Sequence, residues 1–271
     1  MYAVLHMRLA LAFLVPMLAT GTTPRIVVQT SDPELTVFAR ELVPLCEDWY
    51  PKIAEILYGS NPPNPPAEIR IAFDEAGIAG RAEGNEIHLS AAEAKRSAKL
   101  DFRAVVIHEL VHLVQSYPVP ARCDGLRIVG CLLTQRHHFG PTWINEGIAD
   151  YVTYTFFTGT NRPLLRLNSN GQLQGYDESI PYLYGLQSNK TSLHDAYAPR
   201  GVKAGKGYQH GYTVTASFLL WLEQNKDKQI VRKLNAAMRT NSYRDGIWRQ
   251  MLLASVDQLW AEFLGASKQA R

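Results

Sequence analysis

Clusters of like charge are missing from this 271-residue sequence. The 28 lysine and arginine residues nearly balance the 25 aspartate and glutamate residues, which leaves a formal net charge of +3. A charge this small and this dispersed argues against a nucleic-acid partner. The sequence also has no internal repeat and no low-complexity tract. With 46% hydrophobic and 20% charged residues it has an ordinary globular composition, and its length is enough to bury a core.

Long apolar runs are missing too, except near the N-terminus. Arg8 precedes an apolar run over residues 9–19, and small residues stand at Ala19 and Gly21. This order is typical of a secretory signal peptide, and the run is too short to span a bilayer comfortably. We therefore predict a signal peptide over residues 1–21 and a secreted or extracytoplasmic monomer, in the periplasm or cell envelope if the host is bacterial. Stable membrane association is not expected after cleavage; an uncleaved anchor is the alternative.

Cysteine is scarce, with three residues in the chain. Cys123 and Cys131 are eight positions apart in a segment that resembles a loop, and an oxidising compartment would let them pair. Cys46 lies in an apolar helical pattern and is expected to be a buried free thiol. The alternative, in which none of the three is paired, stays open.

The pattern of apolar residues predicts an α+β fold. A long amphipathic helix starts near Ser31 or Asp32, which can cap it, and carries apolar residues at three- and four-residue steps as far as Ile53. We predict one domain over residues 22–271, with a small sheet within about 25–90, a mainly helical part within about 91–265, and an irregular segment over 158–207. The predicted strands are 25–30, 67–73 and 84–90, and the further predicted helices are 101–117 (capped near Asp101), 143–157, 212–224, 229–238, 243–252 and 255–264.

The segment VVIHELVHLVQ, residues 105–115, has the spacing of a metal-binding helix. His108 and His112 are four apart, so they share one helix face and both imidazoles can reach one ion. Glu109 points about a quarter-turn away, where it could take a proton from a metal-bound water. The helix is apolar nearly all round and should be buried, so its polar groups need partners, and one zinc ion would satisfy them.

A third protein ligand should come from a second helix, WINEGIADYV. Glu146 and Asp150 lie four apart on one face of it. We predict that Glu146 completes a site with His108 and His112, and that Asp150 accepts a hydrogen bond from a liganding histidine, His108 in particular. The alternatives are His137 or His138 as ligand, and Asp150 in place of Glu146.

The sequence resembles a known family at six places in the same order. These are NEIHLSA, HELVHLVQ, NEGIADYV, YAPRGVKAGKG, QHGYTVTASFL and SVDQLW. Together they are similar to the basic secretory protein peptidases of plants and bacteria, which are gluzincin-like zinc enzymes, and the resemblance covers about residues 26–264. Residues 117–141 and 160–192 look like insertions relative to that family and would flank the cleft.

The resemblance implies a zincin-like fold in which the helix with the two histidines carries the active site, with Glu146 as third zinc ligand. It implies that Tyr212 stabilises the oxyanion, since it matches a family tyrosine, while His210 stands where the family has glutamine. By the same analogy, residues 84–90 would form an edge strand that pairs with the substrate backbone. The residues of that strand singled out are Asn85, Glu86, Ile87 and His88.

The function predicted on these grounds is a secreted zinc metallopeptidase that acts on a peptide or protein substrate. Glu109 would serve as general base, and Tyr212 or His210 would stabilise the tetrahedral oxyanion. Two alternatives belong to other classes. One is a non-catalytic secreted defence or carbohydrate-binding protein on a peptidase-like scaffold, and the other is a metal-dependent hydrolase of a non-peptide amide or ester.

Overall fold

The structure is a computed structural model that describes residues 23–74, 79–96, 99–117, 140–159, 165–167, 173–176 and 206–269. Only the backbone is described for residues 99–101, 165–167, 173–176, 210 and 267–269. The predicted signal peptide, the Cys123–Cys131 pair, and the alternative ligands His137 and His138 lie outside the described residues.

The N-terminal part is a four-stranded mixed sheet with strand order β1-β2-β4-β3. β1 and β2 are parallel, β2 and β4 are parallel, and β3 runs antiparallel to β4 at the edge. Alternation along the strands puts Ile69, Ile71 and Ile87 in the core with no exposed surface. The strands are β1 (Arg25–Gln29), β2 (Glu68–Asp74), β3 (Gly80–Glu83) and β4 (Glu86–Ser90).

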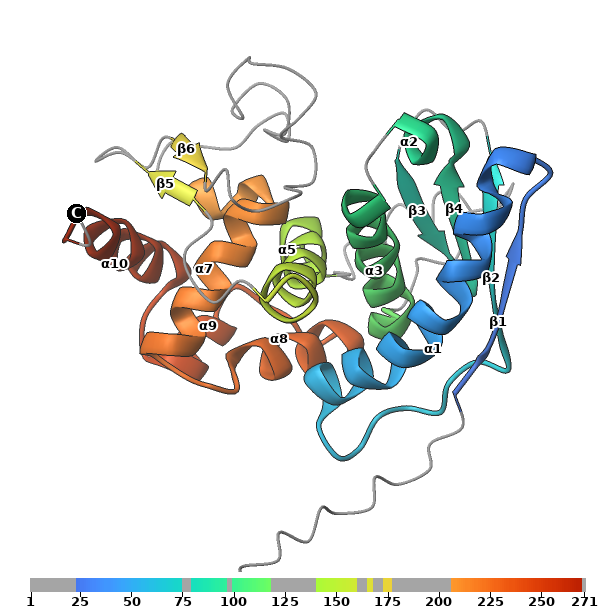
Figure 1. Cartoon of the computed structure of the whole chain (residues 1–271). Coiled ribbons are helices and arrows are strands. Elements are labelled where there is room, and N and C mark those ends of the chain that lie inside the picture. Colours follow the sequence, from blue (N-terminus) through green and yellow to red (C-terminus); the bar gives the residue numbers. More distant parts are fainter. Residues whose placement is uncertain are drawn as a thin grey trace, which may run out of the picture.

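Two helices pack against the apolar face of this sheet, α1 (Thr36–Tyr58) and α3 (Lys99–Gln115) (Figure 1). A short turn, η1 (Pro33–Leu35), leads into α1, and the side chain of Asp32 accepts a hydrogen bond from the Glu34 amide. This is the cap that the sequence predicts. α2 (Ala91–Arg96) connects the sheet to α3. The other face of the sheet carries charged side chains, among them Glu68, Arg70 and Glu86.

The second half is mainly helical and packs beyond α3, away from the sheet (Figure 1). α5 and α7 have the most extensive mutual contact, and α8 closes against α1. The elements are α5 (Thr142–Val152), the π-helical turn η3 (Thr153–Phe157), β5 (Leu165–Leu167), β6 (Leu173–Tyr176), η4 (Gly207–His210), α7 (Tyr212–Asn225), α8 (Ile230–Arg239), α9 (Ile247–Leu252) and α10 (Val256–Gln269).

The α+β class and the division into a small sheet and a mainly helical body are confirmed. All three predicted strands and all the predicted helices are present, and most of their ends lie within four residues of the predicted positions. Three strands were not predicted, namely β3, β5 and β6, and the N-cap near Asp101 is wrong, since α3 begins at Lys99. Cys46 is a buried free thiol, as expected. Among the described residues, no helix combines the length and apolarity needed to cross a bilayer.

Candidate metal centre

Three side chains from two neighbouring helices converge between α3 and α5. His108 and His112 come from α3 and Glu146 comes from α5, and one potential ligand atom from each lies within 4.8 Å of the others. Glu146 Oε2 is 3.3 Å from the Nε2 atom of each histidine, and the two Nε2 atoms are 3.1 Å apart. The structure therefore brings together the three residues that the sequence predicts as metal ligands.

Hydrogen bonds on the far side of each ring indicate which nitrogen faces the cluster. Nδ1 of His108 is 2.7 Å from Asp150 Oδ1, and Nδ1 of His112 is 2.8 Å from Gln115 Oε1. An oxygen acceptor at Nδ1 holds the proton on that nitrogen, so the lone pair of each neutral ring lies on Nε2. Two imidazole lone pairs and one carboxylate thus point at a common position, and such an arrangement is stable only around a cation or a shared proton. This donor set fits one zinc ion.

Asp150 is itself held in place from α7. Its side chain is 1% exposed, and Thr213 Oγ1 donates a hydrogen bond of 3.0 Å to Asp150 Oδ2. One carboxylate oxygen therefore contacts the histidine and the other contacts a hydroxyl, which fixes the carboxylate plane. Thr213 has no signal in the sequence beyond its position next to Tyr212.

The groups of the cluster shift the pKa values of one another, upward for the two histidines and downward for Glu146. Burial alone would lower the pKa of His108 and His112. The hydrogen bonds of His108 to Asp150 and Glu146 outweigh burial and raise its pKa, and the hydrogen bond of His112 to Glu146 does the same for that ring. Burial alone would raise the pKa of Glu146, but its hydrogen bonds to the two histidines hold that pKa well below its usual range. Glu146 is thus an anion, and the space between the three groups attracts positive charge.

Glu109 lies beside the cluster, pressed against the edge strand β3. Its side chain is 3% exposed, and burial raises the pKa of its carboxyl group. A Cβ atom added to Gly80 would lie 2.9 Å from Glu109 Cγ and 3.0 Å from its Oε1, so β3 passes directly over this side chain. A buried carboxylate with a raised pKa is suited to exchange protons near neutral pH.

Tyr212 lies against His108 on the side of α7. The two rings stack at 6.0 Å with an angle of 17° between their planes. Gly211 and Tyr212 both have positive φ, 74° and 43°, which is unusual for a tyrosine and costs energy. The turn thus aims the tyrosine at the cluster. For His210 only the backbone, in η4, is described.

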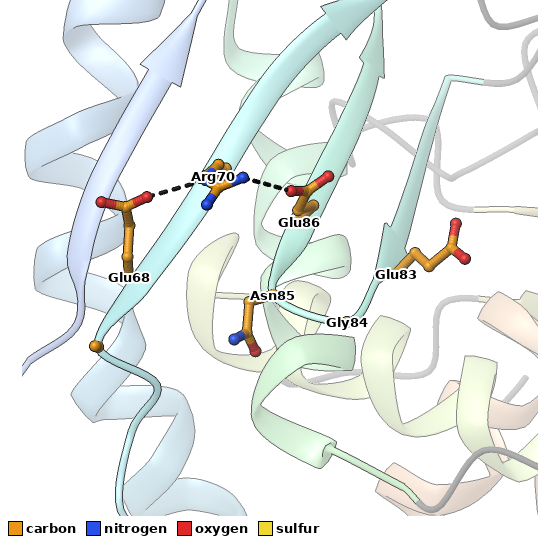
Figure 2. A pocket seen from close by; sticks show the side chains of 7 residues that line it. Glu68, Arg70, Glu83, Gly84, Asn85 and Glu86 are labelled. Carbon is orange, nitrogen blue, oxygen red and sulfur yellow. Dashed lines mark hydrogen bonds and ion pairs between the residues drawn. The ribbon is translucent and has the colours of Figure 1, made fainter.

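The prediction that residues 84–90 form an edge strand is wrong. β4 is paired on both sides, with β2 and with β3, so its backbone groups are already used. Ile87 is buried in the core, and His88 Nδ1 is 3.2 Å from Asp74 Oδ2 on the charged face. Asn85 and Glu86 line a hollow of about 460 Å³ at the turn end of the sheet, where Glu86 pairs with Arg70 (Figure 2). The antiparallel edge is β3.

Comparison with known proteins bears on the C-terminal part of the chain. Residues 188–263 match the family BSP, described as "Peptidase of plants and bacteria". The match supports the resemblance to the basic secretory protein peptidases and contains the last three of the six motifs, whereas the candidate metal ligands precede it. No curated protein and no solved structure matches the chain.

Proposed function

We propose that the protein is a zinc-dependent peptidase with a zincin-like fold. The observation that carries this proposal is the convergence of His108, His112 and Glu146 on one position, with the buried carboxylate of Glu109 next to it. The match to a peptidase family supports peptide bonds as the substrate class. One ion suffices, since the three ligand atoms surround a single position.

Each residue has a definable task in hydrolysis. Zinc, when bound, would acidify a water molecule and polarise the scissile carbonyl. Glu109 would take a proton from the attacking water and deliver it to the leaving amine nitrogen. The hydroxyl group of Tyr212 would donate a hydrogen bond to the carbonyl oxygen as negative charge develops there. Asp150 would keep His108 oriented for binding through Nε2.

Among the described residues β3 is the antiparallel edge strand of the sheet, and an edge strand is the natural place for an extended substrate. β3 pairs with β4 on one side, and it passes over Glu109. A peptide added alongside β3 would be held by backbone hydrogen bonds, which give affinity with little dependence on side chains. The role expected for residues 84–90 thus moves to residues 80–83.

Export from the cytoplasm is part of the proposal and rests on the N-terminal sequence alone. Residues 1–21 have the order of a cleavable secretory signal. The mature chain would begin near residue 22, just before β1. N-terminal sequencing of protein recovered from the culture medium or periplasm of an expressing host tests this directly.

The decisive experiment is the substitution Glu109→Gln in the full mature chain. The amide cannot accept the proton, so cleavage of casein should fall by about 10²- to 10⁴-fold while zinc content stays at one ion per chain. Glu55→Gln, an exposed site on α1, is the control and should behave as the wild type. Undiminished cleavage by Glu109→Gln would refute the mechanism. A wild-type protein that binds zinc without hydrolysing peptides would favour a non-catalytic role.

A further inference from the structure

A buried glutamine bridges the two helices that supply the candidate ligands. Gln115 is the last residue of α3 and has no exposed surface. Its Oε1 is 2.8 Å from Nδ1 of His112, and its Nε2 donates a hydrogen bond of 3.2 Å to the backbone carbonyl of Asn145 on α5. Asn145 directly precedes Glu146, so a single side chain contacts one ligand and the backbone beside another.

The chemistry of these two contacts allows one orientation of the amide group. A backbone carbonyl can only accept a hydrogen bond, so the NH2 end of Gln115 must face Asn145. The oxygen end must then face His112, and an oxygen facing Nδ1 requires a proton on that nitrogen. The carbonyl of Asn145 thereby determines, through Gln115, that the lone pair of His112 is on Nε2.

We propose that Gln115 is a positioning residue of the metal centre, which sets the tautomer of His112 and fixes the spacing between α3 and α5. The inference rests on the metal site of the proposed function but not on peptide hydrolysis. Tyr58 supports the same end of α3, because its hydroxyl lies 3.0 Å and 3.1 Å from the carbonyls of Val114 and Gln115.

The two histidines therefore have chemically different partners. His108 donates to the carboxylate of Asp150, whereas His112 donates to a neutral amide. A second carboxylate would add a negative charge to a buried cluster that already contains Glu109, Glu146 and Asp150. A neutral partner orients the ring without that charge, which keeps a bound cation more electrophilic.

The test measures zinc affinity of the metal-free mature protein by competition with a chromophoric chelator. Gln115→Leu removes both hydrogen bonds and should raise the zinc dissociation constant about 10- to 100-fold. Gln115→Glu is isosteric and retains an acceptor for His112, so it should recover at least half of that loss on a logarithmic scale. If only packing mattered, a buried carboxylate at position 115 would be a worse substitution than leucine. A recovery in Gln115→Glu would therefore show that the loss in Gln115→Leu comes from the missing hydrogen bond to His112.

Asn235→Leu is the matched control. Asn235 is also fully buried, accepts a hydrogen bond of 2.9 Å from the Tyr117 hydroxyl and donates one of 3.2 Å to the carbonyl of Leu57. Its loss should lower the thermal midpoint about as much as Gln115→Leu, with zinc affinity within about threefold of the wild type. Equal zinc affinities of Gln115→Leu and Asn235→Leu, or no recovery in Gln115→Glu, would overturn the inference. Zinc binding without peptide cleavage would refute the proposed function alone.

Discussion

The contact between β3 and Glu109 makes Gly80→Ala an informative substitution. The added methyl group would lie 2.9 Å from Glu109 Cγ and 3.0 Å from Val105 Cγ1, where carbon contacts normally begin near 3.5 Å. Glu109 is 3% exposed and Val105 is fully buried, so neither has space to move into. Overpacking of this kind costs about 1–3 kcal/mol, of which about 0.4–1 kcal/mol is recovered because alanine restricts the unfolded chain. We expect a net loss of about 1–2 kcal/mol in the free energy of unfolding.

The effect on catalysis should exceed the effect on stability. The methyl group displaces the Glu109 side chain by several tenths of an ångström, and a misplacement near 1 Å can reduce a rate about 100-fold. We expect kcat/KM for a fluorogenic peptide to fall about 10- to 100-fold with zinc stoichiometry unchanged. Gly84→Ala is the control, since Gly84 has φ +61° and no atom within 4 Å of its added Cβ. It should cost about 1 kcal/mol through backbone strain and leave kcat/KM within twofold. If Gly80→Ala keeps the activity of Gly84→Ala, the contact does not position Glu109.

Two further predictions follow from buried groups. Asp150→Asn removes the charge that orients His108 and should raise the zinc dissociation constant about 10-fold or more in chelator competition; an unchanged constant would contradict the role of Asp150. Burial raises the pKa of Cys46 from 9.0 to about 12. From pH 9 to 12 the unfolded thiol loses its proton and the folded thiol keeps it, so stability falls as pH rises, by up to about 1.4 kcal/mol per pH unit. Buried tyrosines with a raised pKa, Tyr50 among them, contribute to the same loss of stability at high pH. Urea unfolding of Cys46→Ala should therefore show a shallower slope than the wild type between pH 9 and 10, and identical slopes in both proteins would refute the raised pKa of Cys46.

Much of the site could be predicted from the sequence, because the spacing of residues along a helix determines which side chains share a face. Residues four apart on a helix share a face, so His108 with His112, and Glu146 with Asp150, each required only that a helix form. The helices were predictable from their apolar pattern. The pairing of one helix with the other followed from the need to give buried polar groups partners.

The features that the sequence predicted wrongly or did not predict depend on the tertiary arrangement. β3 has the sequence GRAE, without alternation or β-branched residues, and it is a strand because β4 offers it an edge. Strand order is not encoded in the local pattern of any one strand. The family analogy therefore predicts β4 as the edge, whereas in the structure the edge is β3. One feature of the sequence indicates the role of Gln115: it lies three residues after His112, on the same face of the helix. Its bond to Asn145 depends on how α5 packs.

Close backbone approaches explain why these elements meet at this point. A Cβ atom on Gly147, next to Glu146, would lie 2.2 Å from Thr215 Cγ2, so α7 and α5 lie closer together than any larger residue at position 147 would allow. This close approach brings Thr213 to Asp150 and Tyr212 to His108. Gly80 does the same for β3 above Glu109. The absence of a side chain at Gly80 and at Gly147 therefore allows β3 to lie against Glu109 and α7 to lie against α5, next to the candidate metal ligands.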